Sequence, residues 1–353
     1  MVAGCIALAI SSALIPPIRR IALTKGVVAA PRAERWSVRA TPYLGGVAIV
    51  IASLAIALVE GRHDGRMLAL VAASLAVSLV GLLDDLRPAS IPLRLAIETA
   101  AALVVTGFGM RAHVLSAGPD VVISVIALVV LVNAFNYIDN IDGVLALVSV
   151  AISASITVAA LLSGHMTVAV EAVGVLGACL GFTIFNWHPA SIFMGDAGSL
   201  FLGFYLGSLL FDLRLASNQP TRALTFALMM SVPLFDMAVV YAARTISGRP
   251  LHVGGTDHTS HRMIKAGIPV RMTALILLVA AAISGAVAVA VEQERIDARW
   301  AFAASIAIVV PMCLVVLRLD DSQDGRDHGL PAPSRGKWNQ ASSCESDHDH
   351  SRD

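Results

Sequence analysis

The stretch VVISVIALVVLVNAFNYIDNIDG, residues 121–143, changes character abruptly at its middle. Its first twelve residues are apolar apart from Ser124, whereas the next eleven contain three asparagines and two aspartates. Acidic side chains next to lipid are costly, and where they occur they usually serve a function. The stretch therefore predicts a membrane-spanning helix that ends in a polar site.

The composition of the whole chain is that of a membrane protein. Of its 353 residues, 57% are hydrophobic and 14% are charged, whereas a soluble domain carries about 25% charged residues. We expect an all-α integral membrane protein, a polytopic bundle of about 11 transmembrane helices of roughly 20 residues each. The expected spans are residues 2–18, 43–59, 67–83, 92–107, 120–136, 144–162, 167–185, 198–213, 222–243, 272–291 and 300–317. Because basic residues follow the first span and do not precede it, we interpret it as a retained helix and not a cleaved signal peptide.

The distribution of lysine and arginine predicts the orientation. With these spans, 18 of the 25 Lys and Arg residues fall on one side, which the positive-inside rule makes cytoplasmic. The N-terminus is then outside and the C-terminus is cytoplasmic. Residues 320–353 are polar with no apolar period and predict a disordered cytoplasmic tail, which leaves residues 1–319 as the transmembrane domain. A net charge of zero gives no basic footprint for nucleic acid.

Polar residues gather in four loops on the predicted cytoplasmic side: residues 84–94, 137–143, 186–197 and 244–271. The clusters around positions 84, 139 and 196 contain five carboxylates and, by this interpretation, one cation, Arg87. The carboxylates are Asp84, Asp85, Asp139, Asp142 and Asp196. A divalent cation would offset their charge, and carboxylate oxygens suit Mg²⁺ or Mn²⁺.

A row of polar residues recurs every three positions through the opening stretch: Asn133, Asn136, Asp139 and Asp142. Side chains three residues apart on a helix are neighbours, so each consecutive pair can point to one site. The alternative is that Asn140 or Asp142 caps the following span. Capping accounts for one residue and leaves the row unexplained.

The fourth loop is rich in cations and histidines. His258 and His261 lie near Arg262, Arg249 and Lys265, and too few further ligands are present for a zinc site. Basic groups facing an acidic cluster fit a phosphate substrate held between metal and cations. The alternative is an ordinary positive-inside loop. Asp236, inside the span 222–243, either lines the same cavity or lies at the membrane interface.

Several sequence blocks occur in a fixed order. They are PRAERW…TPYLGG, GLLDDLRPAS, NAFNYIDNIDGV, FNWHPASIFMGDAGSLFLG and DHTSHR. In these blocks, from about Pro31 to Arg262, the chain resembles the polyprenyl-phosphate N-acetylhexosamine-1-phosphate transferase family, glycosyltransferase family 4. The DHTSHR form is more similar to the bacterial sugar-priming branch than to the lipid I branch.

The resemblance implies a reaction and its place in the cell. Residues 1–319 would be a catalytic domain that transfers N-acetylhexosamine 1-phosphate from a UDP-sugar to undecaprenyl or another polyprenyl phosphate. UMP would be released, and a cell-envelope glycan would be started at the cytoplasmic face of the bacterial inner membrane. Mg²⁺ would be the cofactor, with Mn²⁺ as the alternative, and a homodimer is left open.

The resemblance also implies roles for the site residues. Asp196 would be the main metal ligand, and Asp84 and Asp85 would act at the metal–phosphate centre. Together with these two aspartates, the expected catalytic residues are His258, His261 and Arg262, which would position the donor diphosphate and complete the site. The expected substrate-binding residues are Asn133, Asn136, Asp139, Asp142, Phe193 near the uracil, Asp236 and Arg249.

The chain departs from the family's motifs at a few positions. Ser260 stands where a histidine is common in the family, and Ser37 or Val38 stands where a second histidine is common. Pro88 stands where some members have an acidic residue, and Asn140 stands where glycine is common. The identity of the sugar therefore stays open. An inactive or repurposed paralogue, an ion-coupled transporter with these acids as relays and a non-catalytic membrane scaffold are the alternatives.

Overall fold

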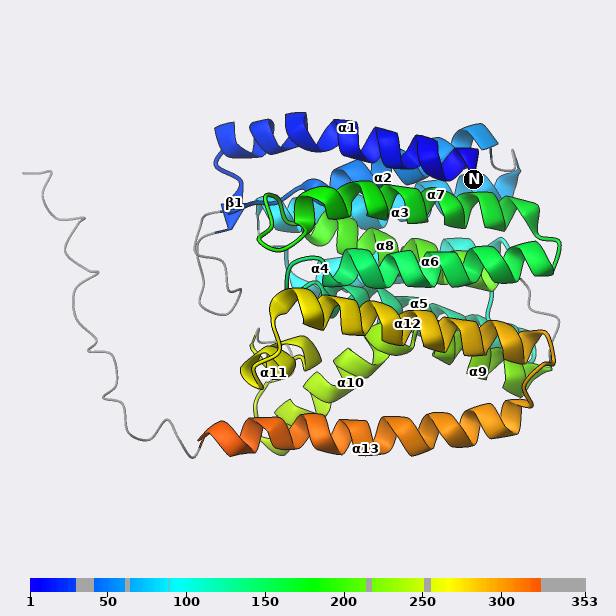
Figure 1. The fold of residues 1–353 in the computed structure, drawn as a ribbon. Coiled ribbons are helices and arrows are strands. Elements are labelled where there is room, and N and C mark those ends of the chain that lie inside the picture. Colours follow the sequence, from blue (N-terminus) through cyan, green and yellow to red (C-terminus); the bar gives the residue numbers. More distant parts are fainter. Residues whose placement is uncertain (30–40, 61–63, 88, 214–217, 251–254, 325–353) are drawn as a thin grey trace, which may run out of the picture.

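The apolar runs fold into helices. A computed structural model describes residues 1–29, 41–60, 64–87, 89–213, 218–250 and 255–324. The helices in that part of the chain are α1 (Val2–Thr24), α2 (Gly45–Glu60), α3 (Gly65–Leu86), α4 (Ile91–Gly107), α5 (Ala117–Ile138), α6 (Val144–Leu162), α7 (Met166–Asn186), α8 (Asp196–Asp212), α9 (Gln219–Met229), α10 (Ser231–Ile246), α11 (Thr259–Lys265), α12 (Val270–Glu292) and α13 (Ala298–Asp324). Most of them run side by side in one bundle (Figure 1), which confirms the predicted all-α polytopic membrane fold.

Each expected span coincides with helical structure. Seven helices of the described chain are long and apolar enough to cross a membrane: α1, α3, α5, α6, α7, α12 and α13. Helices α2, α4 and α8 are shorter, with 16, 17 and 17 residues. The count of eleven crossings, and which side is cytoplasmic, stay predictions.

One expected span is not a single helix. The prediction of a continuous helix over residues 222–243 is wrong, because the chain breaks into α9 and α10, which are bent by 78°. Pro233 lacks an N–H group, and its ring would clash with the carbonyl of Met229, so the first helix ends there. Beyond the break α10 slants across the bundle towards α13 (Figure 1).

Helix α8 forms the centre of the bundle. Every residue from Ala197 to Asp212 is buried, as expected for a helix that is apolar around its whole circumference. It packs against α3 and α5. Its first residue, Asp196, is partly exposed, so the central helix presents a carboxylate at one end of the bundle.

Glycines bring α2 and α3 into backbone contact with the start of α8. A Cβ atom added to Gly46 would lie 2.4 Å from the Cα atom of Gly198. A Cβ atom added to Gly81 would lie 2.4 Å from the carbonyl oxygen of Asp196. Small residues allow helices in membranes to approach this closely. The position of Asp196 is therefore set by backbone packing.

A two-stranded antiparallel sheet, which the sequence did not predict, lies near the same end. Strand β1 (Val28–Ala29) pairs with β2 (Thr41–Pro42). The carbonyl of Pro42 accepts a hydrogen bond from the Phe193 N–H at 2.8 Å, and the Gly45 N–H donates to the Phe193 carbonyl at 3.0 Å. The segment after β2 thus fixes the loop that leads into α8.

The two ends of the helical bundle carry different parts of the chain. The start of α1 lies at one end, whereas β1, α11 and the end of α13 lie at the other (Figure 1). Because α13 continues to Asp324, residues 320–324 of the expected tail are helical. Residues 325–353 lie outside the described chain.

Candidate active site

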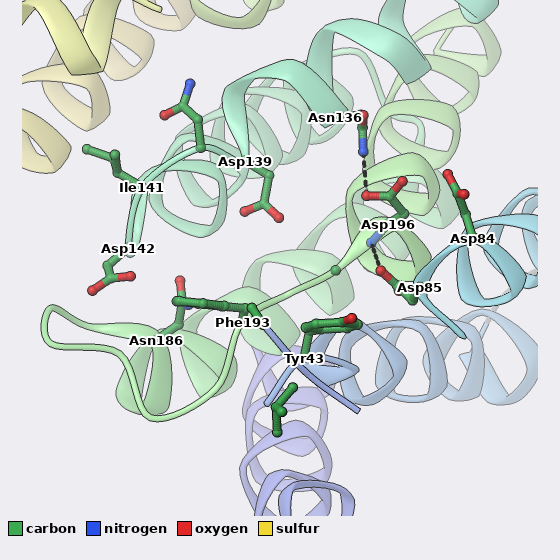
Figure 2. Close-up of a pocket in the computed structure, with 14 residues that line it drawn as sticks. Tyr43, Asp84, Asp85, Asn136, Asp139, Ile141, Asp142, Asn186, Phe193 and Asp196 are labelled. Atoms are coloured by element: carbon green, nitrogen blue, oxygen red, sulfur yellow. Dashed lines mark hydrogen bonds between the residues drawn. The ribbon is translucent and has the colours of Figure 1, made fainter. Parts of the chain in front are cut away.

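A cavity of about 520 Å³ opens at the end of the bundle that carries β1. Its lining comes from β1, the segment after β2, the ends of α3, α5 and α7, the turn after α5, and the loop before α8 with the first residue of α8. The lining residues are Val28, Ala29, Tyr43, Asp84, Asp85, Asn136, Asp139, Asn140, Ile141, Asp142, Asn186, Phe193, Gly195 and Asp196. Figure 2 shows Asp84, Asp85 and Asp196 on one side and Asp142 on the other, with Asp139 between them. All five predicted carboxylates therefore meet in one cavity.

Asp85 anchors the start of α8. Its carboxylate oxygens accept hydrogen bonds from the Asp196 N–H at 2.9 Å and the Ala197 N–H at 3.1 Å. These N–H groups have no partner within the helix, so a carboxylate from α3 supplies their acceptor. The preceding residue, Gly195, has φ +76° and ψ 172°, a conformation that is essentially restricted to glycine.

Arg94 is the cation that the sequence analysis missed. Its Nη1 atom lies 3.4 Å from Asp84 Oδ2 and 3.4 Å from Asp196 Oδ2. Arg87, the cation proposed for this cluster, is exposed and does not line the cavity. Arg94 escaped notice because it lies in the first turn of α4, at the edge of an expected span. Its spacing of four residues from Glu98 was the available signal.

Glu98 and Asn133 hold Arg94 in place. The Glu98 carboxylate is fully buried, lies 3.4 Å from Arg94 Nε and accepts a 2.7 Å hydrogen bond from Asn133 Nδ2. Arg94 Nη2 donates to Asn133 Oδ1 at 3.0 Å. Asn133 is absent from the cavity lining and supports the arginine, and its role in substrate binding stays a prediction.

The rest of the polar row separates at the end of α5. Asn136 reaches α8, where Nδ2 donates to Asp196 Oδ1 at 2.9 Å and to Ser199 Oγ at 3.0 Å (Figure 2). The helix ends at Ile138, and Gly143, with φ +78°, is the residue before the start of α6. This turn spreads Asp139 and Asp142 around the cavity. A continuing helix would have carried these two side chains away from the cavity.

Asn186 and His188 tie the turn to the loop before α8. Asn186 Oδ1 accepts from the Gly143 N–H at 2.9 Å, and its Nδ2 donates to the Ile192 carbonyl at 2.9 Å. Asp142 Oδ2 lies 2.7 Å from His188 Nδ1 and accepts from the Ala190 N–H at 3.0 Å. Asp142 therefore braces the segment that carries Phe193, and it does not cap α6.

The predicted histidine group lies beside the cavity and is absent from its lining. His258 Nδ1 is 2.8 Å from Asp236 Oδ2, and the Thr259 N–H donates to Asp236 Oδ1 at 2.7 Å. Asp236 is buried, so it anchors the start of α11 from α10. Burial lowers the pKa of His261 to about 4, with the neighbouring His258 adding to the shift. Its imidazole is accordingly neutral at pH 7.

The arginines of this region form ion pairs with Asp257 or hydrogen bonds with nearby backbone carbonyl groups. Arg249 Nη2 and Arg244 Nε contact the Asp257 carboxylate at 2.6 and 3.2 Å. Burial alone would raise the pKa of Asp257, but hydrogen bonds from the two arginines hold it below its usual value. Arg262 is buried and donates to the carbonyls of Asp257 and Val316, at 2.9 and 3.2 Å.

Three of the motif departures, Ser37, Val38 and Pro88, lie outside the described residues. The other two do not. Ser260 and Asn140 meet in a hydrogen bond of 2.6 Å.

Comparisons with known proteins identify the family of the chain. Residues 67–214 match glycosyl transferase family 4, a region that contains all five carboxylates and Arg94. The chain is 30% identical over 277 residues to the probable undecaprenyl-phosphate N-acetylglucosaminyl 1-phosphate transferase of Bacillus subtilis, covering 74% of this chain and 76% of that protein.

Two further relatives carry related names. The decaprenyl-phosphate N-acetylglucosaminephosphotransferase of Mycobacterium tuberculosis is 28% identical, with 74% of each chain covered. The undecaprenyl-phosphate alpha-N-acetylglucosaminyl 1-phosphate transferase of Escherichia coli is 24% identical, with 80% of this chain and 81% of that protein covered. The ordered motifs, the helical membrane fold and these relatives agree: the chain belongs to glycosyl transferase family 4, the polyprenyl-phosphate N-acetylhexosamine-1-phosphate transferases.

Proposed function

We propose that the chain transfers N-acetylhexosamine 1-phosphate from a UDP-sugar to polyprenyl phosphate at the acidic cavity and releases UMP. The observation that carries this proposal is that five aspartates line one cavity, where two of them, Asp84 and Asp196, contact Arg94 at 3.4 Å. Its volume of about 520 Å³ is in the range of small-molecule sites. The acids line a cavity together with residues of β1, which lies at one end of the bundle (Figure 1). This does not favour the transporter alternative, whose acids belong near the bilayer midplane.

The reaction exchanges one phosphorus–oxygen bond for another. An oxygen of the lipid phosphate forms a bond to the sugar-linked phosphorus of the donor. The bond from that phosphorus to the bridging oxygen breaks, and the electron pair leaves with UMP. A phosphate monoester is already largely ionised at pH 7, so removing a proton is a minor need. Bringing two anions together is the main one.

The residues fit a magnesium ion. Within the described chain no three His, Cys, Asp or Glu side chains are grouped as a metal site. Mg²⁺ seldom needs such a group, because it is usually held by one or two carboxylates with water and substrate phosphates. Asp84 and Asp196, which share one Arg94 nitrogen, are such a pair. Bound there, Mg²⁺ or Mn²⁺ would supply positive charge to the donor diphosphate and the departing UMP.

The chain's own groups orient the reactants. Arg94 has a planar fork of donors suited to phosphate oxygens, and Glu98 and Asn133 fix its direction. The first N–H groups of α8 are occupied by Asp85. The helix end therefore positions Asp196 and is not offered to a phosphate. On the opposite side, Asp139, Asp142 and the Phe193 ring would receive the nucleoside, which an aromatic ring can bind by stacking.

We place this cavity at the cytoplasmic face of the bacterial plasma membrane. The support is the excess of lysine and arginine in the loops on the same predicted side. A UDP-sugar donor is a cytoplasmic metabolite, which agrees with this orientation.

Release of UMP by the purified protein tests the proposal. The assay contains detergent, undecaprenyl phosphate, Mg²⁺ and a panel of UDP-N-acetylhexosamines, with Asp196→Asn as the comparison. We expect UMP release that requires lipid and metal and falls at least about 100-fold in the variant. Folded wild-type protein that is silent with every donor would contradict the proposal.

A further inference from the structure

Two residues far apart in the sequence form a direct link beside the cavity. The Ser260 hydroxyl donates a hydrogen bond to Asn140 Oδ1 at 2.6 Å, across 120 residues. Ser260 is fully buried on α11, whereas Asn140 lines the cavity between Asp139 and Asp142. The hydroxyl therefore joins the short helix to the cavity wall.

Two further side chains at the start of α11 hydrogen-bond to other helices. His258 binds Asp236 of α10, and Arg262 binds the Val316 carbonyl of α13. Of these three side chains, Ser260 is the one that reaches the turn after α5. On its opposite side that turn is already fixed by Asn186 and by Asp142. The turn is therefore held on one side by Asn186 and Asp142 and on the other side by the hydrogen bond from Ser260.

Both polar atoms of the Asn140 side chain are used. Nδ2 donates to the Tyr137 carbonyl at 3.1 Å, while Oδ1 accepts from Ser260. This pair of contacts fixes the orientation of the amide. It also closes the turn onto the last residues of α5. The neighbouring carboxylates on the same short turn share that restraint.

We infer that the Ser260–Asn140 hydrogen bond is a positioning device for donor binding, with Ser260 setting the turn that presents Asp139 and Asp142. This inference rests on the proposed function, because it assigns those carboxylates to the nucleotide side. Loss of the hydroxyl raises the KM for the UDP-sugar about tenfold, the factor expected for one hydrogen bond. The KM for polyprenyl phosphate changes little, since the Asp84–Arg94–Asp196 side is held separately.

A double-mutant cycle tests the inference in the full chain. The variants are Ser260→Ala, Asn140→Ala and the double variant, and the matched control is Ser284→Ala. Ser284 also takes part in hydroxyl hydrogen bonds between helices, to Ser231 and the Leu228 carbonyl, away from the cavity. We expect each single change at the pair to raise the donor KM about tenfold. The double variant should be no worse than either single one, and the control should keep the wild-type donor KM.

A second measurement does not depend on turnover. The rise in melting midpoint caused by UDP-N-acetylglucosamine with Mg²⁺ should shrink in both single variants and persist in Ser284→Ala. If Ser260→Ala does not fold, Asn140→Ala carries the test alone. Additive effects in the cycle, or an unchanged donor KM and unchanged ligand-induced shift, would overturn the inference. A wild type that binds the donor and releases no UMP would contradict the proposed reaction, and leave the positioning claim to the binding data.

Discussion

Replacing Gly195 by alanine tests how the start of α8 controls the site. Gly195 has φ +76° and ψ 172°, where a side chain costs about 1–3 kcal/mol. The added Cβ atom would lie 2.6 Å from Asp85 Oδ2. An ordinary separation of about 3.5 Å requires the carboxylate to retreat by about 1 Å.

That retreat breaks the cap of α8. The bonds from Asp85 to the Asp196 and Ala197 N–H groups, now 2.9 and 3.1 Å, would lengthen beyond hydrogen-bonding distance. Loss of such a cap costs about 0.5–2 kcal/mol, so the free energy of unfolding should fall by about 1.5–5 kcal/mol in total. A displacement of about 1 Å at a reacting group can lower the rate about 100-fold.

The assay compares Gly195→Ala with Gly164→Ala. Gly164 also has φ +76°, but a Cβ atom there meets nothing within 4 Å, and it lies in the turn between α6 and α7 at the far end of the bundle. Thermal unfolding and UMP release are measured for both. We expect both to be destabilised and only Gly195→Ala to lose about 100-fold in kcat. Equal activity in the two variants would refute the reasoning about Asp85 and the cap.

Three further outcomes are expected. Arg94→Gln should lower kcat/KM at least about 100-fold and raise the Mg²⁺ concentration needed for half-maximal UMP release. Arg94→Lys should be intermediate, because lysine lacks the bidentate fork of arginine. An unchanged dependence on Mg²⁺ would count against Arg94 as the link between Asp84 and Asp196. For His261, the pKa of about 4 in the folded protein lies below about 6.5 in the unfolded chain, so the unfolded state binds more protons between these values. Stability is therefore complete above pH about 6.5 and falls by up to about 3 kcal/mol towards pH 4, a loss that His261→Asn should reduce in melting curves across this range. His188→Ala should raise the donor KM about tenfold with a smaller effect on kcat, and His188→Asn should recover part of the lost donor affinity. Identical kinetics for wild type and His188→Ala would show that the contact between His188 and Asp142 does not matter.

Much of the site could be predicted from residue type and order. A charged side chain beside lipid is energetically costly and is therefore easy to recognise as a candidate site residue. All five aspartates chosen for this reason line the cavity. Spacing worked where a helix continued, as at Asn136, which reaches Asp196. The apolar runs located the helices because membrane length is a strong constraint.

The missed features depend on contacts between distant segments. Arg94 looked like the polar edge of a span, because its partners Asp84 and Asp196 come from other helices. Asp236 was expected near substrate, yet its partner is the start of α11. The break before α10 was hard to predict, because the long apolar run predicts one continuous helix whereas Pro233 predicts an interruption. A proline can kink a membrane helix or end it, and the surrounding packing decides between the two outcomes.

The glycine contacts between α2, α3 and α8 have a consequence for engineering. Exchanging glycine for alanine is a common way to stabilise a protein, because alanine restricts the unfolded chain. At Gly46, Gly81 and Gly198 the new methyl group would fall within 2.4–2.5 Å of a neighbouring atom, two of these being backbone contacts. Because those neighbours continue directly into Asp196, a thermostabilised variant has to gain its rigidity elsewhere in the bundle. At the far end of the bundle, a Cβ atom added at Gly164 would meet no neighbour within 4 Å, so a change there leaves the chemistry in place, but the φ of +76° makes alanine strained at Gly164 itself.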